Sequence, residues 1–201
     1  MSLRLQNKQK ARANILNAAN ALIVKKGLEL ATTRKIAASA GVSYQTLYNY
    51  FPTKADIVLS LLEAELLSWK SASDDVIKHY SGDLIATLTE FIQINLDSIN
   101  RAGKDLWRFV TVQAFNREIS IEALNLYSSI AHEDYYALLN LAHGMGHLKQ
   151  ETDLHLLAHT LYVLADHATG RYILGELDDA HFMVTQRQII ELVTNPYLRS
   201  E

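Results

Sequence analysis

The chain has 201 residues and contains no cysteine. This absence excludes disulfide bonds, thiol-based redox sensing and zinc sites built from cysteine ligands. No stretch approaches the roughly twenty consecutive apolar residues that a membrane-spanning helix needs, and the polar N-terminus lacks the apolar core of a signal peptide. We therefore expect a cytoplasmic protein with no membrane partner.

Proline is scarce as well, with only two residues in the chain. No segment shows the alternation typical of a β-strand, and apolar residues instead recur at three-four spacing between breaks at glycine. This pattern predicts an all-α fold of about nine helices. Beyond residue 54, we expect helices over residues 54–74, 84–100, 105–116, 120–142, 153–175 and 180–194.

Acidic residues are nearly absent from the N-terminal quarter. Residues 1–54 contain nine lysines or arginines and one acid, Glu29, which gives a net charge of +8. The whole chain carries −3, so residues 55–201 carry −11. The average composition therefore hides a basic head on an acidic body, and the head is suited to a polyanion such as DNA.

The first twelve residues form a leading basic arm. Its cations are Arg4, Lys8, Lys10 and Arg12. Two interpretations stay open for this arm: a disordered terminus that aids solubility, or a contact with the minor groove or the backbone of DNA.

Residues 32–54, which read TTRKIAASAGVSYQTLYNYFPTK, have the pattern of two short helices joined by a tight turn. Thr32 and Ser43 are residue types that cap helix N-termini, and Gly41 can adopt the left-handed angles that end the first helix. Leu47 is expected to point inward. Helical periodicity requires no apolar partner for Tyr44, Gln45, Thr46, Tyr48, Asn49 and Tyr50. The pattern predicts a DNA-reading helix-turn-helix.

A further helix start follows directly. Thr53 and Asp56 have the spacing of a capping box that opens a long helix, with Lys54 in its first turn. A cation in that turn opposes the helix dipole, whereas an anion bound close by would compensate it and would also meet the free amides of the helix end.

The run from Ile15 to about Leu61 resembles the bacterial TetR-family transcriptional repressors. The resemblance rests on the stop at Gly27, Thr32-Thr33, Ile36-Ala37, the AGVS turn, Leu47-Tyr48 and Phe51-Pro52-Thr53-Lys54. It implies a helix-turn-helix DNA-binding domain over residues 1–54 and a helical effector-binding and dimerisation domain over residues 55–201. It also implies that a small molecule bound in the second domain releases a palindromic operator.

The resemblance further implies which side chains contact DNA, and their chemistry agrees. Arginine can bind guanine with two hydrogen bonds, glutamine and asparagine can pair with adenine, and a tyrosine ring can contact the thymine methyl group. We expect base contacts from Arg34, Tyr44, Gln45 and Asn49. We expect phosphate contacts from Thr33, Thr46, Tyr48, Tyr50 and Lys54. The alternative for the tyrosines at 48 and 50 is packing beneath the head with only their hydroxyls exposed.

The helix predicted over residues 153–175 is hydrophobic on two faces. One face can pack inside the subunit, and the other carries Leu156, Val163, His167, Gly170 and Leu174. A second copy could cover this face in a four-helix bundle. We therefore expect a homodimer whose two heads read half-sites about 34 Å apart or a multiple of that distance. The alternative is a wholly buried helix in a monomer.

The resemblance implies an effector pocket in the body, but the sequence names no ligand. Large rings suit a hydrophobic pocket with a few polar contacts. The candidates are Trp107, Phe109, Tyr136 and Tyr162. Residues 107 and 109 leave a helix on different faces, so only one of them should face a given cavity. The alternative is that these rings fill the core. If they line a cavity, the preferred guest is apolar or aromatic.

Histidines with helical spacing raise the question of a metal site. His143 and His147 flank a glycine-rich segment where helical geometry should fail, and His155 and His159 would need a third ligand such as Glu151. We therefore predict neither a metal nor a cofactor.

Motifs of known enzymes are missing too. The chain has no nucleophile elbow, P-loop, HExxH or Rossmann glycine pattern. We therefore expect no enzymatic activity. The alternative is a helical enzyme or scaffold without DNA binding, which would have to explain why the basic charge and the turn motif fall within the same fifty residues.

Overall fold

The computed structural model describes residues 3–115 and 121–199. These residues form nine α-helices and a short 3-10 helix. Their one β-type pairing is an isolated antiparallel bridge between Leu148 and Leu198. The all-α prediction is therefore confirmed. The elements are α1 (Leu3–Lys26), α2 (Thr33–Ser39), α3 (Tyr44–Tyr50), α4 (Lys54–Lys78), α5 (Leu84–Ala102), α6 (Lys104–Phe115), α7 (Ile121–Gly144), α8 (Leu154–Leu174), α9 (Asp179–Thr194) and η1 (Asn195–Tyr197).

The predicted helix ends agree with these bounds to within two residues, except at the end of α4. This helix continues to Lys78, four residues beyond the predicted end. Two contacts hold the helical turn that leads into this extension: Lys70 pairs with Asp74, and the Ser73 hydroxyl donates to the Trp69 carbonyl at 3.0 Å. The polar composition of this segment therefore does not end the helix.

The chain divides into two compact units. The first comprises Met1–Glu65 and Ile99–Ala123, and the second comprises Leu66–Ser98 and Leu124–Glu201. This division differs from the predicted boundary after residue 54. The first unit includes the N-terminal part of α4 and also α6, which contacts α1. An ion pair of 3.0 Å between Arg101 and Glu65 joins α5 to α4 inside this unit.

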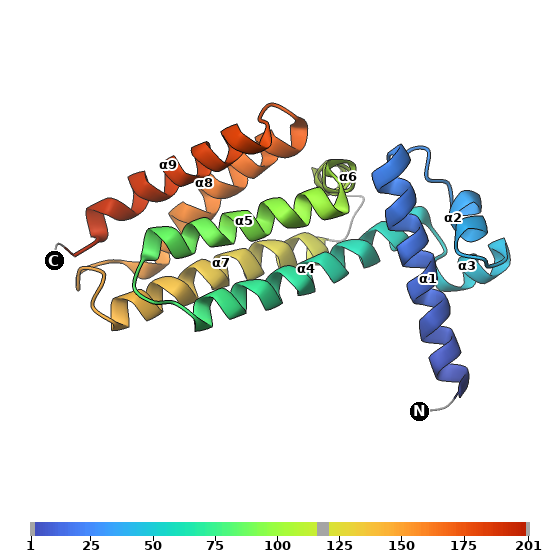
Figure 1. Ribbon diagram of the computed structural model, residues 1–201, viewed down its shortest axis with the longest axis horizontal. Helices are drawn as coiled ribbons and strands as arrows, with labels where there is room; N and C mark the ends of the chain where they lie inside the picture. The colour runs from blue at the N-terminus through green and yellow to red at the C-terminus, as the bar shows by residue number, and fades with distance from the viewer. Residues whose placement is uncertain (1–2, 116–120, 200–201) are drawn as a thin grey trace. The chain divides into compact units, whose positions relative to one another are not determined.

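The first unit has a core shared by α1, α2, α3 and the start of α4 (Figure 1). Its central residues, each at most 3% exposed, are Ile15, Ala19, Ile23, Ile36, Ala37, Leu47, Phe51, Ile57 and Val58. The short helices α2 and α3 each bury one or two apolar side chains in this core. Their remaining faces are therefore left for solvent or a partner.

The second unit contains α8 and α9 lying side by side (Figure 1). The amide of the buried Gln186 ties them together, since its Nε2 donates to the Ala165 carbonyl at 2.9 Å and to Thr169 Oγ1 at 3.2 Å. The rings of Tyr172 and Phe182 pack with their centroids 4.6 Å apart. The inner face of α8 is thus fully used within the chain.

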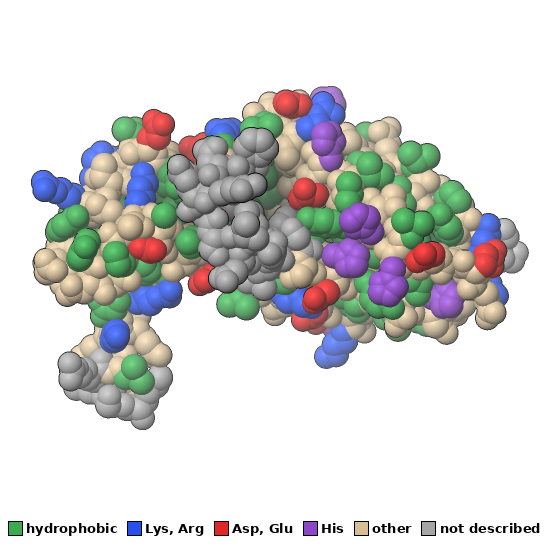
Figure 2. All heavy atoms as spheres, turned by 180° about the vertical axis from the view of Figure 1, so that it is seen from behind, with side chains coloured by type: hydrophobic (Ala, Val, Ile, Leu, Met, Phe, Trp, Pro, Cys, Tyr) green, Lys and Arg blue, Asp and Glu red, His purple; other side chains and the backbone are tan. Residues whose placement is uncertain are grey.

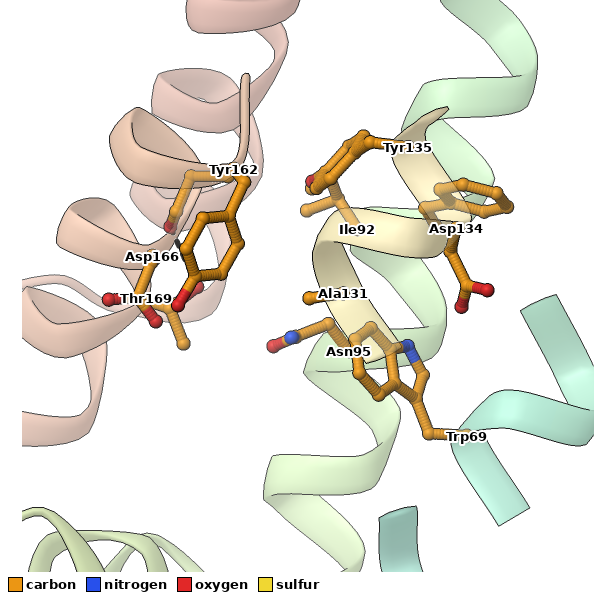
Figure 3. Close-up of a pocket in the computed structure, with 11 residues that line it drawn as sticks. Trp69, Ile92, Asn95, Ala131, Asp134, Tyr135, Tyr162, Asp166 and Thr169 are labelled. Carbon is orange, nitrogen blue, oxygen red and sulfur yellow. Dashed lines mark hydrogen bonds between the residues drawn. The ribbon is translucent and has the colours of Figure 1, made fainter. Parts of the chain in front are cut away.

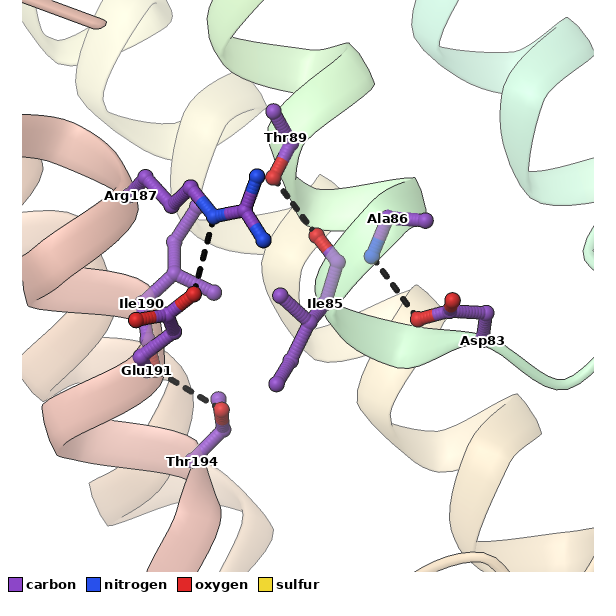
Figure 4. Close-up of polar contacts among 8 residues, drawn as sticks. All are labelled: Asp83, Ile85, Ala86, Thr89, Arg187, Ile190, Glu191 and Thr194. Atoms are coloured by element: carbon purple, nitrogen blue, oxygen red, sulfur yellow. Dashed lines mark hydrogen bonds and ion pairs between the residues drawn. The ribbon is translucent and has the colours of Figure 1, made fainter. Parts of the chain in front are cut away.

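The start of α5 is fixed by its own N-cap. Asp83 Oδ1 accepts a hydrogen bond from the Ala86 amide at 2.9 Å (Figure 4). On α9, Arg187 pairs with Glu191 at 2.8 Å, and Figure 4 shows the Arg187 side chain reaching towards the first turns of α5. The helix α5 supplies one wall of the cavity described below.

Candidate nucleic-acid interface and buried cavity

The turn between α2 and α3 has the geometry that its sequence predicts. Thr32 Oγ1 caps α2 by accepting from the Lys35 amide at 3.3 Å, and Ser43 Oγ caps α3 by accepting from the Thr46 amide at 3.0 Å. Gly41 has φ +68°, where a Cβ would be strained. The two helices are therefore held in a tight, capped turn.

Four predicted base-reading residues share an exposed surface, which we call the α2–α3 surface: Arg34, Tyr44, Gln45 and Asn49. The Arg34 guanidinium carbon lies 5.9 Å from the centroid of the Tyr44 ring, and Gln45 Nε2 donates to Asn49 Oδ1 at 3.1 Å. Tyr44 is 49% exposed. The structure thus brings together an arginine fork, two amides and a ring, all of which can reach a base edge.

The predicted phosphate-binding residues differ in exposure. Thr33, Thr46 and Tyr50 are half-buried, whereas Tyr48 is 48% exposed. The Thr46 hydroxyl lies 2.8 Å from Ser43 Oγ at the start of α3. The ring of Tyr48 therefore does not pack beneath the head, while that of Tyr50 is partly covered.

Lys54 is placed differently from the other cations of the head. Its ammonium donates to the Leu28 carbonyl, and burial lowers its pKa although the charge of Glu29 opposes that shift. The predicted capping box is present: the Thr53 amide donates to Asp56 Oδ2 at 2.7 Å, and the Asp56 amide donates to Thr53 Oγ1 at 3.1 Å. The ammonium has three N–H donors, so two remain for a phosphate while one donates to the Leu28 carbonyl.

The basic arm is part of α1 from Leu3 onwards. Lys8, Lys10 and Arg12 are all exposed, and Arg12 also contacts the rest of the first unit. Its guanidinium carbon is 5.3 Å from the Phe51 ring centroid, and Nη2 donates to Ser60 Oγ at 3.0 Å. The side chain of residue 4 lies outside the described part. Arg12 thus stabilises the packing of α1 against the start of α4.

The second unit contains a small cavity between α4, α5, α7 and α8 (Figure 3). With its side chains as placed, the cavity measures about 20 Å³, room for little more than one water molecule. Its lining residues are Trp69, Phe91, Ile92, Asn95, Ala131, Asp134, Tyr135, Tyr162, Ala165, Asp166 and Thr169.

One of the four predicted pocket rings, Tyr162, lines this cavity. Trp107 and Phe109 lie on α6 in the first unit, the former buried and the latter half-buried. Tyr136 stacks on His155 with a centroid distance of 4.3 Å. These three rings are not among the lining residues of the cavity.

Two acids of the lining were missed by sequence reasoning. Asp134 is 2% exposed, and its Oδ1 lies 2.9 Å from Lys70 Nζ. Burial raises the pKa of Asp134, and the hydrogen bond and charge of Lys70 oppose the shift. Asp166 is an exposed residue at the rim, yet desolvation of its carboxyl raises the pKa, with His167 opposing. A single acid inside the apolar run of α8 is the signal that could have found it.

Histidine side chains gather on one face of the second unit (Figure 2). The rings of His132 and His159 have centroids 6.1 Å apart, and His132 is 6.5 Å from Tyr162. His143 and His147 have different partners. His143 Nε2 lies 3.4 Å from the Gln150 carbonyl oxygen, and His147 Nδ1 lies 2.8 Å from the Tyr80 hydroxyl. Within the described residues, no group of three potential ligands is placed to hold a metal ion.

The outer face of α8 carries the residues predicted for the dimer interface. Leu156 and Leu174 are each 58% exposed, Val163 is 45% exposed, and His167 is exposed beside the half-exposed Gly170. On α9, Val184 and Leu192 are 56% and 76% exposed and were not predicted. Their spacing of two helical turns is the signal that points to a shared face. The face defined by these seven residues is called the outer α8–α9 face below.

Comparisons with known proteins agree with this architecture. Residues 15–61, which contain the helix-turn-helix, match the family described as "Bacterial regulatory proteins, tetR family". None of the curated proteins compared is similar enough to count as a match. In the part described, no helix combines the length and apolar composition needed to span a membrane.

Three solved structures share the fold over nearly their full length. A TetR transcription regulator from Haloarcula marismortui has a TM-score of 0.78 at 19% identity, over 95% of this chain and 100% of that chain. A putative transcriptional regulator from Saccharomonospora viridis in complex with choline has a TM-score of 0.73 at 19% identity, over 96% and 100%. Thermus thermophilus FadR, a TetR-family repressor in complex with lauroyl-CoA, has a TM-score of 0.68 at 20% identity, over 94% and 96%.

The fold and the exposed α2–α3 surface define the class, a helical protein with an N-terminal helix-turn-helix. The match of residues 15–61 to a family model makes this class more specific. Residues 15–61 match the tetR family of bacterial regulatory proteins, as the resemblance implied, and the chain shares its fold with solved structures of TetR-type regulators.

Proposed function

We propose that this protein is a homodimeric transcriptional regulator, acting as a repressor, that binds a palindromic DNA operator through its N-terminal helix-turn-helix. A small molecule bound in the second unit releases the operator. The observation that carries the proposal is the α2–α3 surface, where four side chains able to read base edges lie exposed on a capped turn.

Electrostatics supports a DNA partner. The head carries nine basic residues and one acid over residues 1–54. Basic side chains neutralise phosphates and release the ions condensed on DNA, so affinity should fall steeply with salt. The exposed hydroxyl of Tyr48 and the half-buried Thr33, Thr46 and Tyr50 border the base-reading residues and supply phosphate contacts that fix the register. Lys54 joins them through the ammonium donors that the Leu28 carbonyl does not use.

The outer α8–α9 face supports dimerisation through these two helices. Isolated exposed apolar residues are ordinary, but this face combines five large aliphatic side chains from two adjacent helices. A second copy would cover it as a four-helix bundle, with Gly170 permitting close approach. The two-fold axis of such a dimer explains why the operator is expected to be palindromic.

Small-molecule control is supported by the cavity and by the neighbouring structures. The regulators from S. viridis and T. thermophilus hold choline and lauroyl-CoA, respectively. In this chain, the candidate site is the cavity between α4, α5, α7 and α8. The helix α4 belongs to both units, so a change at the cavity wall has a covalent route to the head.

The test is DNA binding by the purified protein against a randomised duplex library, followed by titration in increasing salt. We expect selection of a palindrome and affinity that falls linearly on a log-log salt plot. Gln45→Ala should change the preferred base at one position of each half-site by about tenfold, because the amide reads a base edge. Tyr48→Phe should weaken all sequences about equally, since its hydroxyl binds a phosphate.

Two results would contradict the proposal. Failure to enrich any duplex, or affinity that is insensitive to salt, would remove the DNA-binding function. A change of sequence preference in Tyr48→Phe with a uniform loss in Gln45→Ala would instead reverse the roles assigned to these residues.

A further inference from the structure

The walls of the cavity are rich in aromatic rings. Trp69, Phe91, Tyr135 and Tyr162 come from four different helices and surround the same space (Figure 3). Phe91 and Tyr135 meet edge to face, with centroids 6.0 Å apart. The faces of such rings carry negative electrostatic potential, so they attract cations as well as apolar groups.

The charged side chains among the eleven lining residues are both acids, Asp134 and Asp166. Asp134 is balanced by Lys70, which approaches it from α4 at 2.9 Å. Asp166 makes no ion pair with any described residue, and its nearest charge partner is the adjacent His167. Asp166 is exposed at the rim of the cavity, and a ligand that covers its carboxylate on binding must supply a countercharge, which a bound cation would do.

Asn95 adds a second unmet requirement. Its side-chain oxygen is buried and has no hydrogen-bond partner among the described residues. Figure 3 shows the Asn95 side chain directed from α5 towards Tyr162 and Thr169, across the cavity. Buried acceptors are normally paired, and leaving one unpaired costs about 1–3 kcal/mol. A ligand with an N–H donor would satisfy it.

We propose that the effector of this regulator is an organic ammonium ion that binds in this cavity. This inference rests on the proposed function and names the class of its effector. The ammonium group lies between Asp166 and Asn95 Oδ1 and donates to both, and the hydrocarbon part lies among the four rings. The predicted apolar or aromatic guest therefore carries a positive charge.

Other ligand classes fit the same residues poorly. A carboxylate or phosphate would face two acids and an unpaired acceptor, with no lysine, arginine or histidine among the lining residues to receive it. A neutral hydrocarbon would fill the space between the rings but would leave Asp166 and Asn95 unpaired. Only a cation with hydrogen-bond donors meets both needs.

An ammonium ion larger than water must enlarge the cavity on entry. Tyr162 and Asp166 are one turn apart on α8, and both are partly exposed. The opposite walls contain the buried Trp69, Phe91 and Tyr135. Opening is therefore expected at the α8 rim, where side-chain rotation costs the least packing.

The test is isothermal titration calorimetry of the full-length protein with three ligands of nearly equal size: benzylammonium, benzyl alcohol and benzoate. Methylammonium and butylammonium extend the series to smaller cations. We expect at least one ammonium ion to bind, benzylammonium to bind at least tenfold more tightly than benzyl alcohol, and benzoate not to bind. Asp166→Asn should weaken ammonium binding at least tenfold.

The matched control is Glu133→Gln, which neutralises an exposed acid next to Asp134 and should leave ammonium affinity unchanged. Thermal unfolding measurements check that Asp166→Asn is folded. Tyr162→Leu is a second cavity variant, for which we expect a loss of ammonium affinity. Equal affinity for alcohol and ammonium, tighter binding of benzoate, no ammonium binding, or full affinity in folded Asp166→Asn would overturn the proposal.

Operator binding is measured on the same preparations. A protein that binds its operator but no ammonium ion defeats the inference about the effector and leaves the regulator intact. A protein that binds ammonium ions as expected but no DNA defeats the proposed function instead. The expected result is both activities, with benzylammonium lowering operator affinity in the wild type and not in Asp166→Asn.

Discussion

The two units place charge in opposite ways. In the first unit, cations and amides lie on the exposed faces of very short helices, and the apolar side of each helix is limited to one or two residues. In the second unit, two acids line a cavity surrounded by rings, with Asp134 buried and Asp166 exposed at the rim. Under the proposed function, the positive charge of the first unit binds DNA and the negative charge of the second unit binds the effector.

The difference shows how burial decides what a charge can do. The charge of a single exposed lysine or arginine is screened by salt, so several such charges must act together. This suits binding to a phosphate backbone. A desolvated carboxylate interacts strongly with a single ion, which suits selection of one ligand class. The following predictions break or sharpen this contrast, from the largest effect to the smallest.

Leu47→Ala should destabilise the first unit and leave the second unit folded. Leu47 is 1% exposed in the core of the first unit, and its truncation should lower the free energy of unfolding of that unit by about 3 kcal/mol. Operator binding should be lost, because α3 no longer packs firmly, while ammonium binding by the second unit is retained. Urea unfolding monitored by circular dichroism, with calorimetric titration, checks both results.

Leu30→Ala is the matched control, because Leu30 lies in the same unit and is 57% exposed. Its cost should stay below about 1 kcal/mol. An equal loss in the two variants would mean that Leu47 does not hold α3 in place.

Lys70→Met should sharpen the account of charge in the second unit. It removes the partner of the buried Asp134, so the folded-state pKa of that carboxyl, already raised by burial, should rise further. A group with a raised folded-state pKa stabilises at acid pH and loses that contribution as pH rises through the folded pKa. The variant should thus be less stable than wild type by about 2 kcal/mol at neutral pH and by much less below pH ~4.

Urea unfolding at the two pH values measures the difference. The double variant Lys70→Met with Asp134→Asn should recover most of the neutral-pH loss, because no unpaired carboxylate remains buried. A loss that is the same at both pH values would show that Lys70 contributes packing rather than charge.

Gly170→Ala tests the outer α8–α9 face and should have the smallest effect on the subunit. A methyl group at this position meets no heavy atom within 4 Å in its own chain, and alanine favours a helix by up to about 1 kcal/mol. Each subunit should therefore gain stability while the dimer dissociates more readily. Sedimentation over a dilution series, together with urea unfolding, separates the two effects.

Gly144→Ala at the end of α7 is the matched control, since a methyl group there also meets nothing within 4 Å. It should not change dimer dissociation. A dimer unaffected by Gly170→Ala would place the interface elsewhere.

The head could be predicted from sequence in detail because its structure depends on neighbours along the chain. Thr32, Gly41 and Ser43 act within four residues of their own position. The two N-caps and the turn could therefore be predicted from the sequence around them. The exposed face of α3 followed from a single inward leucine. What the sequence could not show was the side chain of Lys54, whose partner, the Leu28 carbonyl, is 26 residues away.

The cavity could not be predicted for the opposite reason. Its lining comes from four helices, and no local pattern brings Trp69 of α4 near Tyr162 of α8. Adjacent residues leave a helix on different faces, and accordingly Glu133 is exposed while Asp134 is buried. This geometry cannot say which of them turns inward, because that depends on Lys70 and on the packing of α4 against α7.

The position of Asp166 has a genetic consequence. Asp166 is exposed, so asparagine at this position should change the stability of the protein little while it removes the carboxylate proposed to bind the effector. Asparagine codons differ from aspartate codons by one base. In bacteria selected for permanent repression of the target promoter, we expect this substitution to recur. The variant regulator should stay bound to its operator because it no longer binds its inducer.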